Sequence, residues 1–182
     1  YLSGRRDMAT AESALAEAHR ALPHATNIQF ALGRLYETHR QPAKARATYE
    51  DIRDHNRSKP AGGSAKVKLA ALDWAEGKQE AATQQLQEVL RDNPRASDAL
   101  MLEGRIALQH GDGRDAVQAF RTVLKDQPEH SEAYALLGQA HLMLEETNLA
   151  RENLEKAVAL SPNLYQAHLA LAILDASSGR TR

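Results

Sequence analysis

Apolar side chains recur along this chain three or four residues apart, in stretches separated by short polar breaks. Ala11, Leu15 and Ala18 belong to one such stretch, and another runs from Ala116 to Leu124. This spacing places the apolar residues on one face of an amphipathic α helix. The breaks contain glycine, proline or polar pairs, which end helices. The pattern therefore predicts helices joined by short turns.

Two residue types also repeat at a longer interval. Alanine occurs at positions 11, 45, 82, 116 and 150, and proline follows at positions 23, 60, 94, 128 and 162. Each series advances by 34 residues, with a single step of 37 residues near Pro60. A period of this length is typical of solenoids, in which each supersecondary unit packs only against its neighbours.

Each repeat is predicted to contain a helix A, a short turn, a helix B and a proline-marked linker. The A helices are expected at 25–38, 63–76, 96–110, 131–144 and 165–177. The B helices are expected at 8–21, 42–57, 79–91, 113–125 and 147–159. Gly111-Asp112-Gly113 imitates part of a dinucleotide-binding fingerprint, but it follows a helix rather than a strand, so we interpret it as a hairpin turn.

The three extra residues fall late in the second helix B or in the stretch 57–63. Because three residues are close to one helical turn, a longer helix keeps the stack in register; a looser loop at 58–64 is the competing interpretation. Residues 1–6 are expected to end a helix A and its turn, and residues 178–180 to form the turn after the last helix A. Natural solenoids end in a polar capping repeat, so we expect this one to continue.

The residues between these landmarks resemble the tetratricopeptide repeat family, with its W-x₂-L-G-x₂-Y…A-x₃-F…P pattern. Matches are Leu32-Gly33-x₂-Tyr36 with Ala45-x₃-Tyr49, Gly104 with Ala116-x₃-Phe120, and Tyr134-x₂-Leu137-Gly138 with Ala150. Asp73 stands where the pattern has an aromatic residue. We expect Gly104 and Gly138 to let helix A cross close to Ala116 and Ala150, while Tyr36, Tyr49 and Phe120 fill the gaps between successive hairpins.

The resemblance implies an all-α fold, a right-handed superhelical α-solenoid of antiparallel helix pairs over residues 1–182. Its repeats would be 26–62 with the three-residue insertion, 63–96, 97–130 and 131–164, between a partial repeat at 1–25 (helix B) and another at 165–182 (helix A). In this family the A helices line a concave face that takes peptides or protein segments. Carried over by repeat position, the groove residues would be Phe30, Arg34, Val67, Trp74, Met101, Arg105, Leu108, Gln139 and Leu142.

Two kinds of groove residue have competing interpretations. Trp74, the single tryptophan, is either an exposed recognition anchor or a filler between neighbouring helices. Arg34 and Arg105 occupy equivalent positions two repeats apart and are suited to gripping a carboxylate. Local pairing, of Arg34 with Glu37 and of Arg105 with a neighbouring helix, is the favoured alternative.

Composition narrows the function classes. Charged residues make up 26% of the chain and the net charge is −1, which does not indicate nucleic-acid binding. The absence of cysteine excludes disulfides and thiolate sites in this chain and is compatible with a bacterial cytoplasm or periplasm. No apolar run reaches 18 residues, so no membrane span is predicted. The eight histidines form no metal-binding pair in sequence, and we interpret His141 and His168 as partly buried structural residues.

No catalytic, cofactor or metal site is predicted. The sequence favours a non-enzymatic protein-protein interaction scaffold, binding a partner peptide or protein segment in the groove lined by the A helices. An alternative is a docking or regulatory segment of a longer bacterial enzyme or of an envelope or exopolysaccharide export assembly, because arrays of this style resemble scaffolds associated with such machinery. A third hypothesis is self-association through uncapped ends.

Overall fold

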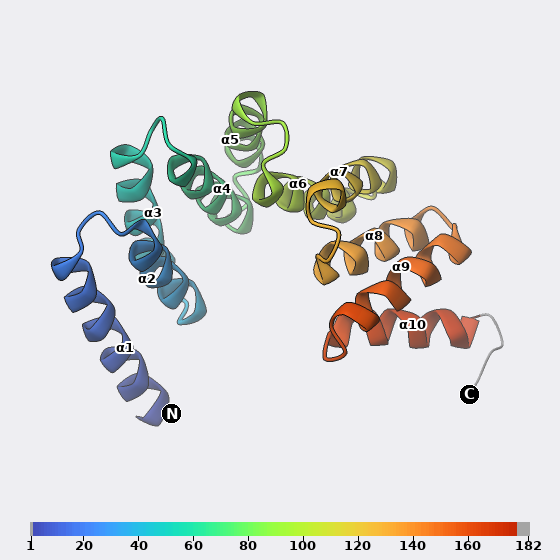
Figure 1. Ribbon diagram of the computed structural model, residues 1–182, viewed down its shortest axis with the longest axis horizontal. Helices are drawn as coiled ribbons and strands as arrows, with labels where there is room; N and C mark the ends of the chain where they lie inside the picture. Colours follow the sequence, from blue (N-terminus) through green and yellow to red (C-terminus); the bar gives the residue numbers. More distant parts are fainter. Residues whose placement is uncertain (1, 178–182) are drawn as a thin grey trace. The chain divides into compact units, whose positions relative to one another are not determined.

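The computed structural model describes residues 2–177, with side chains from residue 8 to residue 176. It divides into two compact units, unit 1 (residues 1–92) and unit 2 (residues 93–182), and each is described by itself. Every regular element in the described range is an α helix (Figure 1). Unit 1 contains α1 (Leu2–Ala21), α2 (Thr26–Thr38), α3 (Pro42–His55), α4 (Pro60–Ala75) and α5 (Gln79–Asp92). Unit 2 contains α6 (Ser97–His110), α7 (Gly113–Asp126), α8 (Ser131–Met143), α9 (Thr147–Leu160) and α10 (Tyr165–Ser177).

The even-numbered helices are the predicted A helices and the odd-numbered ones are the predicted B helices. The all-α helical-repeat solenoid expected from the sequence is therefore confirmed. The turn expected within residues 1–6 is wrong, because α1 already begins at Leu2. The turn expected at 178–180 lies outside the described residues. A single solenoid with the stated repeat boundaries and a right-handed superhelix over the whole chain stay predictions.

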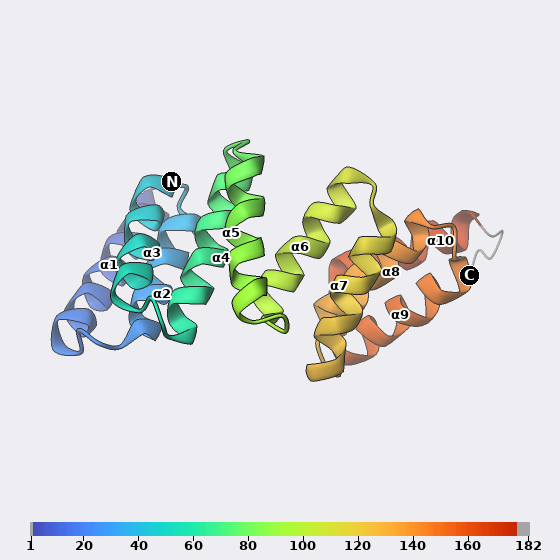
Figure 2. The same ribbon diagram turned by 90° about the horizontal axis from the view of Figure 1, so that it is seen from above.

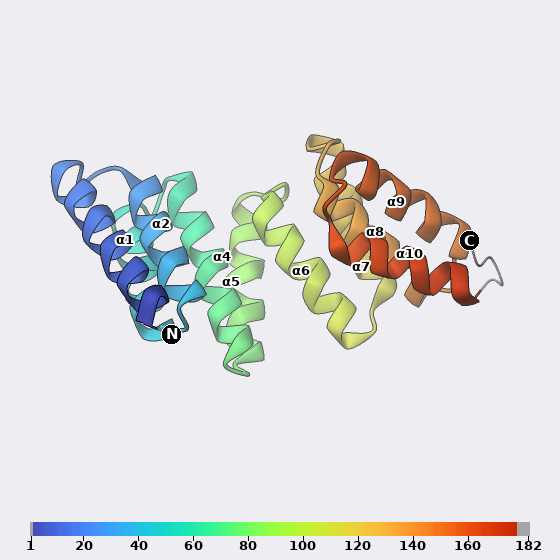
Figure 3. The same ribbon diagram turned by 90° about the horizontal axis from the view of Figure 1, so that it is seen from below.

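Each helix packs against the preceding one within its unit, so the units are built from antiparallel hairpins (Figure 2). In unit 2, α8 also contacts α6 and α10, which places the three A helices next to one another (Figure 3). A cluster around Tyr49 and Ile52 forms the core of α2, α3 and α4. A second cluster around Leu154 joins α8, α9 and α10.

The three-residue insertion lies in the first turn of α4. The α3 helix ends at His55, and its linker, residues 56–59, is as long as the linkers at 22–25, 127–130 and 161–164. The added turn makes α4 16 residues long, with Pro60 in its first turn, where proline is well tolerated. Gly62 is required there, because a Cβ would collide with the backbone oxygen of Asn56. The predicted location within residues 57–63 is therefore confirmed, while a longer helix B and a loop at 58–64 are wrong.

In the four described turns from a helix A to its helix B, a left-handed residue follows helix A. These residues are Arg40 (φ 55°), Gly77 (φ 79°), Gly111 (φ 87°) and Glu145 (φ 60°). Gly111 follows α6 directly and closes it, which confirms that the Gly111-Asp112-Gly113 stretch is a hairpin turn. Arg40 and Glu145 hold a conformation that costs a residue with a Cβ about 1 kcal/mol, and the same turn geometry recurs despite that cost.

Within each hairpin a small residue of helix A faces a large residue of helix B. A Cβ on Gly104 would lie 2.5 Å from Cε1 of Phe120, and one on Gly138 would lie 2.7 Å from Cγ of Leu154. Gly33 stands in the same relation to Tyr49. Gly138 also lies close to Ala150 as expected, since its Cβ would be 3.2 Å from the Ala150 backbone oxygen, but the tightest contact of each glycine is with the large B-helix side chain of its own hairpin. Phe120 and Tyr49 are fully buried. Tyr36 and Tyr49 share a core cluster with Ala65 and Leu69 of α4, so they fill the space between successive hairpins as expected.

A polar contact joins three of the B helices to the following A helix at one pair of repeat positions. The B-helix residue directly follows the repeat alanine, and the A-helix residue occupies the tyrosine position of the pattern. The pairs are Tyr36 donating to Glu12 (2.9 Å), Arg46 with Asp73 (2.8 Å) and Arg151 with Asp175 (2.7 Å). We call these contacts inter-repeat latches. Asp73 and Asp175 therefore replace an aromatic latch with an ionic one.

The Asp73 latch ties three helices together. Asp73 is only 6% exposed, and its two carboxylate oxygens accept from Arg46 of α3 and, at 2.6 Å, from Gln85 of α5.

In the latch between Tyr36 and Glu12, burial and the bond to Glu12 raise the pKa of Tyr36 to about 12, while the bonds from Lys44 and Tyr36 lower the pKa of Glu12. The neutral phenol and the ionised carboxylate that this latch requires are therefore both present at neutral pH.

The first prediction concerns the glycine crossing. Gly104→Ala forces a methyl group against the buried ring of Phe120. Overpacking of this kind costs about 1–3 kcal/mol, against a gain of about 1 kcal/mol in helix propensity. We expect urea denaturation to show a net loss of about 1 kcal/mol in the free energy of unfolding.

The control is the double variant Gly104→Ala/Phe120→Leu, which copies the buried pair Ala70 and Leu86 at the equivalent positions. Because leucine leaves room for the methyl group, the double variant should be more stable than the sum of the two single losses predicts, by about 1 kcal/mol. Strictly additive losses would contradict the close crossing.

The second prediction concerns the ionic latch. Asp73→Ala removes the acceptor shared by Arg46 and Gln85, which leaves Gln85 without this partner and Arg46 with Glu76 alone (3.1 Å). We expect a loss of about 2–3 kcal/mol in the free energy of unfolding. The control is Lys66→Gln, which breaks the more exposed pair of Lys66 with Glu88 (3.1 Å) and should cost less than about 1 kcal/mol. Equal losses of stability in the two variants would show that the buried Asp73 latch contributes no more than an exposed ion pair.

Candidate functional site

The predicted groove residues of unit 1 lie on α2 and α4 and differ in exposure. Phe30 is half-buried, with its ring centroid 6.0 Å from that of Tyr49. Val67 is 7% exposed, which argues against direct contact with a partner. Arg34 is exposed and forms no ion pair with a described residue, so the expected pairing with Glu37 is absent. Trp74 is half-buried on the last turn of α4.

The predicted groove residues of unit 2 lie on α6 and α8. Met101 is 8% exposed, which argues against its direct contact with a partner. Leu108, Gln139 and Leu142 are half-buried, and Leu142 packs on the core cluster around Leu154. Arg105 is exposed and pairs with Glu132 of α8, which confirms the expected pairing with a neighbouring helix. The accessible part of this face is therefore mixed, with a charged pair beside partly apolar positions.

Helix α10 continues this face with residues that the sequence reasoning did not include. Leu169 is 45% exposed and Ile173 is 60% exposed. They stand two 34-residue repeats after Met101 and Arg105, so they occupy equivalent positions on helix A. Counting the same register one helix further would have found them. We use the name A-helix face for Arg105, Gln139, Leu142, Leu169 and Ile173.

A cavity of about 370 Å³, here called the linker pocket, opens in unit 1 between two linkers. Its lining residues come from the end of α1, the start of α2, the end of α3 and the linkers that follow α1 and α3. They are His19, Pro23, His24, Thr26, Gln29, Asp51, His55, Asn56 and Lys59. Three imidazoles and one ammonium group thus surround a single carboxylate.

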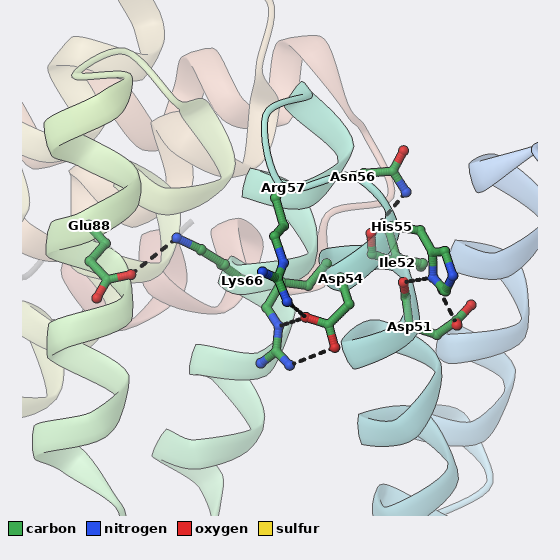
Figure 4. A network of polar contacts seen from close by, with 9 residues as sticks. Asp51, Ile52, Asp54, His55, Asn56, Arg57, Lys66 and Glu88 are labelled. Atoms are coloured by element: carbon green, nitrogen blue, oxygen red, sulfur yellow. Dashed lines mark hydrogen bonds and ion pairs between the residues drawn. The ribbon is translucent and has the colours of Figure 1, made fainter.

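That carboxylate is already engaged. Asp51 Oδ2 accepts a hydrogen bond from Gln29 Nε2 (2.7 Å), and Asp51 Oδ1 lies 3.1 Å from His55 Nδ1. His55 Nδ1 is also 2.9 Å from the backbone oxygen of Asp51, as Figure 4 shows. Both neighbours of Nδ1 are acceptors, so the ring proton resides on Nδ1 and Nε2 is left for another partner.

Charged groups at the end of α3 and on α4 are paired with other residues. Arg57 lies 3.7 Å from Asp54, and Lys66 is paired with Glu88 of α5 (Figure 4). A hydrogen bond from the Arg53 guanidinium lowers the pKa of Asp54. Asn56 donates to the backbone oxygen of Ile52 (2.9 Å) and so fixes the start of the linker.

The pocket was not predictable from sequence patterns, because its histidines belong to separate elements and have no repeat spacing. Within the described residues no group of three or more His, Asp or Glu side chains is arranged to hold a metal ion. His141 is 1% exposed, with Nδ1 2.5 Å from Glu146, which confirms a structural role. His168 is exposed, with Nε2 2.8 Å from the backbone oxygen of Pro162, so its expected burial is wrong. No helix of the described chain is both long and apolar enough to span a membrane.

Several solved structures are similar to this chain. MamA from Desulfovibrio magneticus RS-1 (residues 41 to the end) is 19% identical with a TM-score of 0.66, covering 85% of this chain and 86% of that one. YrrB, a tetratricopeptide repeat protein with an unusual peptide-binding site, is 21% identical with a TM-score of 0.60, covering 94% and 87%. The Cut9–Hcn1 hetero-tetramer of APC/C is 16% identical with a TM-score of 0.77, covering 95% of this chain and 34% of that one. At these identities the likeness is one of fold.

No curated protein matches the sequence at a significant level. The tetratricopeptide repeat family model matches residues 67–113 and 102–165, more than half of the chain. The match spans α6, α7 and α8 and the glycine crossings of two hairpins, which are the elements that carry the 34-residue period. By sequence and by fold, this chain belongs to the tetratricopeptide repeat family.

Proposed function

We propose that this chain is a non-enzymatic protein-protein interaction scaffold that binds a peptide or protein segment along its A helices. The observation that carries the proposal is the exposure of Ile173 on α10, at the repeat position of Arg34, Arg105 and Gln139, which is exposed or half-buried in each of these repeats. Most large apolar side chains of unit 2 are buried or half-buried. Contiguous exposed apolar side chains on a folded surface are typical of interaction sites. Membership of a family of interaction modules supports the same conclusion.

The composition of the A-helix face indicates what kind of segment it binds. Leu142, Leu169 and Ile173 offer apolar contacts, while Gln139 stands between them with an amide that can donate and accept. The Arg105–Glu132 pair is exposed on both sides, so its charges are available to a partner at little desolvation cost. We propose that the bound segment presents apolar side chains to α10 and polar ones to α6. A peptide-binding site in YrrB, which has a similar fold, supports this mode of binding.

Two other roles stay open as proposals. The chain is alternatively a docking or regulatory segment within a longer bacterial enzyme or an envelope or exopolysaccharide export assembly, in which case the A-helix face would bind another part of that assembly. Self-association is the third, because Tyr165, Leu169 and Ile173 are exposed in a line on α10. Light scattering over a concentration series distinguishes it, since the apparent mass would rise with concentration and Leu169→Glu would abolish the rise.

The third prediction tests the A-helix face with a partner purified after affinity capture on the intact chain. Leu169→Glu places a charge among the apolar contacts of α10, and we expect it to weaken binding at least about tenfold, as the lost burial of one leucine implies. Arg105→Glu should also weaken binding. The dissociation constants are measured by isothermal titration calorimetry.

The matched control is Leu149→Glu on helix B α9, in the same unit. Leu149 is 39% exposed, close to the 45% of Leu169. We expect its variant to bind within about twofold of the unchanged chain, because single surface substitutions away from a contact have small effects. If Leu149→Glu weakens binding and Leu169→Glu does not, the partner binds the B helices and the proposed face is wrong.

A further inference from the structure

The linker pocket of unit 1 contains several hydrogen-bond donors that make no contact with the rest of the described chain. Nδ1 of His19 is buried and has no hydrogen-bond partner. The side chains of His24 and Lys59 are exposed on the pocket wall and form no ion pair with a described residue. Nε2 of His55 has no contact with a described residue; it accepts in the neutral ring, whose proton is on Nδ1, and donates when the ring carries both protons. The pocket therefore holds more donor capacity than the chain itself uses.

The charge balance of the pocket favours an anion. Asp51 is the only acidic residue in the lining, and both of its carboxylate oxygens already have partners in Gln29 and His55. Against this one carboxylate stand the ammonium group of Lys59 and three imidazole rings, whose nitrogens can donate hydrogen bonds to an anion. The groups facing the cavity are thus His19 of α1, His24 and Lys59 of the linkers, and Asp51 and His55 of α3; α2 contributes only uncharged Thr26 and Gln29.

The size of the cavity indicates a group larger than a bare ion. At about 370 Å³ it is within the range of pockets that take organic ligands rather than single ions. Pro23 and the imidazole faces add apolar surface to the wall. A carboxylate on a short aliphatic side chain combines the charge and the apolar stem that such a wall accommodates.

We propose that the linker pocket binds the carboxylate of an acidic side chain in a peptide, with His24 and Lys59 as its principal contacts. This site is separate from the A-helix face and does not depend on it. It lies where two linkers meet in unit 1, whereas the proposed A-helix face belongs to unit 2. A charge-assisted hydrogen bond from an ammonium or imidazolium group to a carboxylate is among the stronger polar contacts in proteins.

The fourth prediction uses a hexaglutamate peptide with blocked ends and the intact chain at low ionic strength. We expect calorimetry to detect binding at pH 6.0 and several-fold weaker binding at the same pH in high salt, because salt screens the attraction between exposed charges. The double variant His24→Gln/Lys59→Gln should weaken binding at pH 6.0 by about tenfold or more, as loss of charge-assisted hydrogen bonds implies. Both side chains are exposed, so the fold is expected to be unchanged and circular dichroism verifies it.

Two controls locate the binding. Lys125→Gln removes one exposed, unpaired positive charge in unit 2 and should leave the affinity within about twofold. In NMR spectra the ring protons of His24 and His55 should shift on addition of peptide, and those of His168 should not. A hexaglutamine peptide should not bind.

Three outcomes overturn the proposal. No binding of hexaglutamate at pH 6.0 rules out the site. Equal weakening by Lys125→Gln and by the pocket variant shows that the peptide responds only to net charge. If inorganic phosphate binds as tightly as the peptide and is lost in the same variant, the pocket is a general anion site and the assignment to an acidic side chain is wrong.

Discussion

The close crossing of helix A with its own helix B is the contact on which the rest of the structure depends. Gly33, Gly104 and Gly138 leave no room for a Cβ beside the large B-helix residue that faces them. The left-handed residue before each turn aims helix B back along helix A, so the turn and the crossing form one unit. The insertion obeys the same constraint. It extends α4 at the end where no crossing occurs and leaves the buried pair Ala70 and Leu86 in register.

The helices and turns were predictable because the signals that define them are local and recur every 34 residues. The 34-residue period determines which helix A packs against which helix B, but it does not identify the individual residues that are in contact. Gly104 was therefore assigned to Ala116 when it meets Phe120. The insertion was located only to within a helix and a linker, since Pro60 serves equally well in a turn or in the first turn of a helix. The contact partner of Gly104 and the location of the insertion both depend on packing distances, and a sequence period contains no information about distances.

The inter-repeat latches show why the chemistry of a repeat position is harder to predict than its place. One pair of positions holds a phenol with a carboxylate at Tyr36 and Glu12, and guanidinium–carboxylate pairs at Asp73 and Asp175. Asp73 looked like a departure from the family pattern because its partner, Arg46, lies in the preceding repeat. A pattern written one repeat at a time cannot register such a pair. Because both residues of the pair differ together between repeats, the buried polar side chain has a hydrogen-bond partner in each of the three latches.

The same distinction separates the two proposed binding surfaces. Positions on the A-helix face occur once in every repeat, and the residues equivalent to Arg105 are Arg34, Ala71, Gln139 and Ile173. They change from charged to apolar without disturbing the crossing, because they point away from helix B. The linker pocket instead depends on side chains that occur in one place, since the linker residue after the repeat proline is histidine only at His24. The A-helix face can be predicted from the repeat register alone. The linker pocket cannot, because it forms only when the fold brings α1, α3 and two linkers together. A scaffold built this way can vary its extended face repeat by repeat while keeping one chemically distinct pocket.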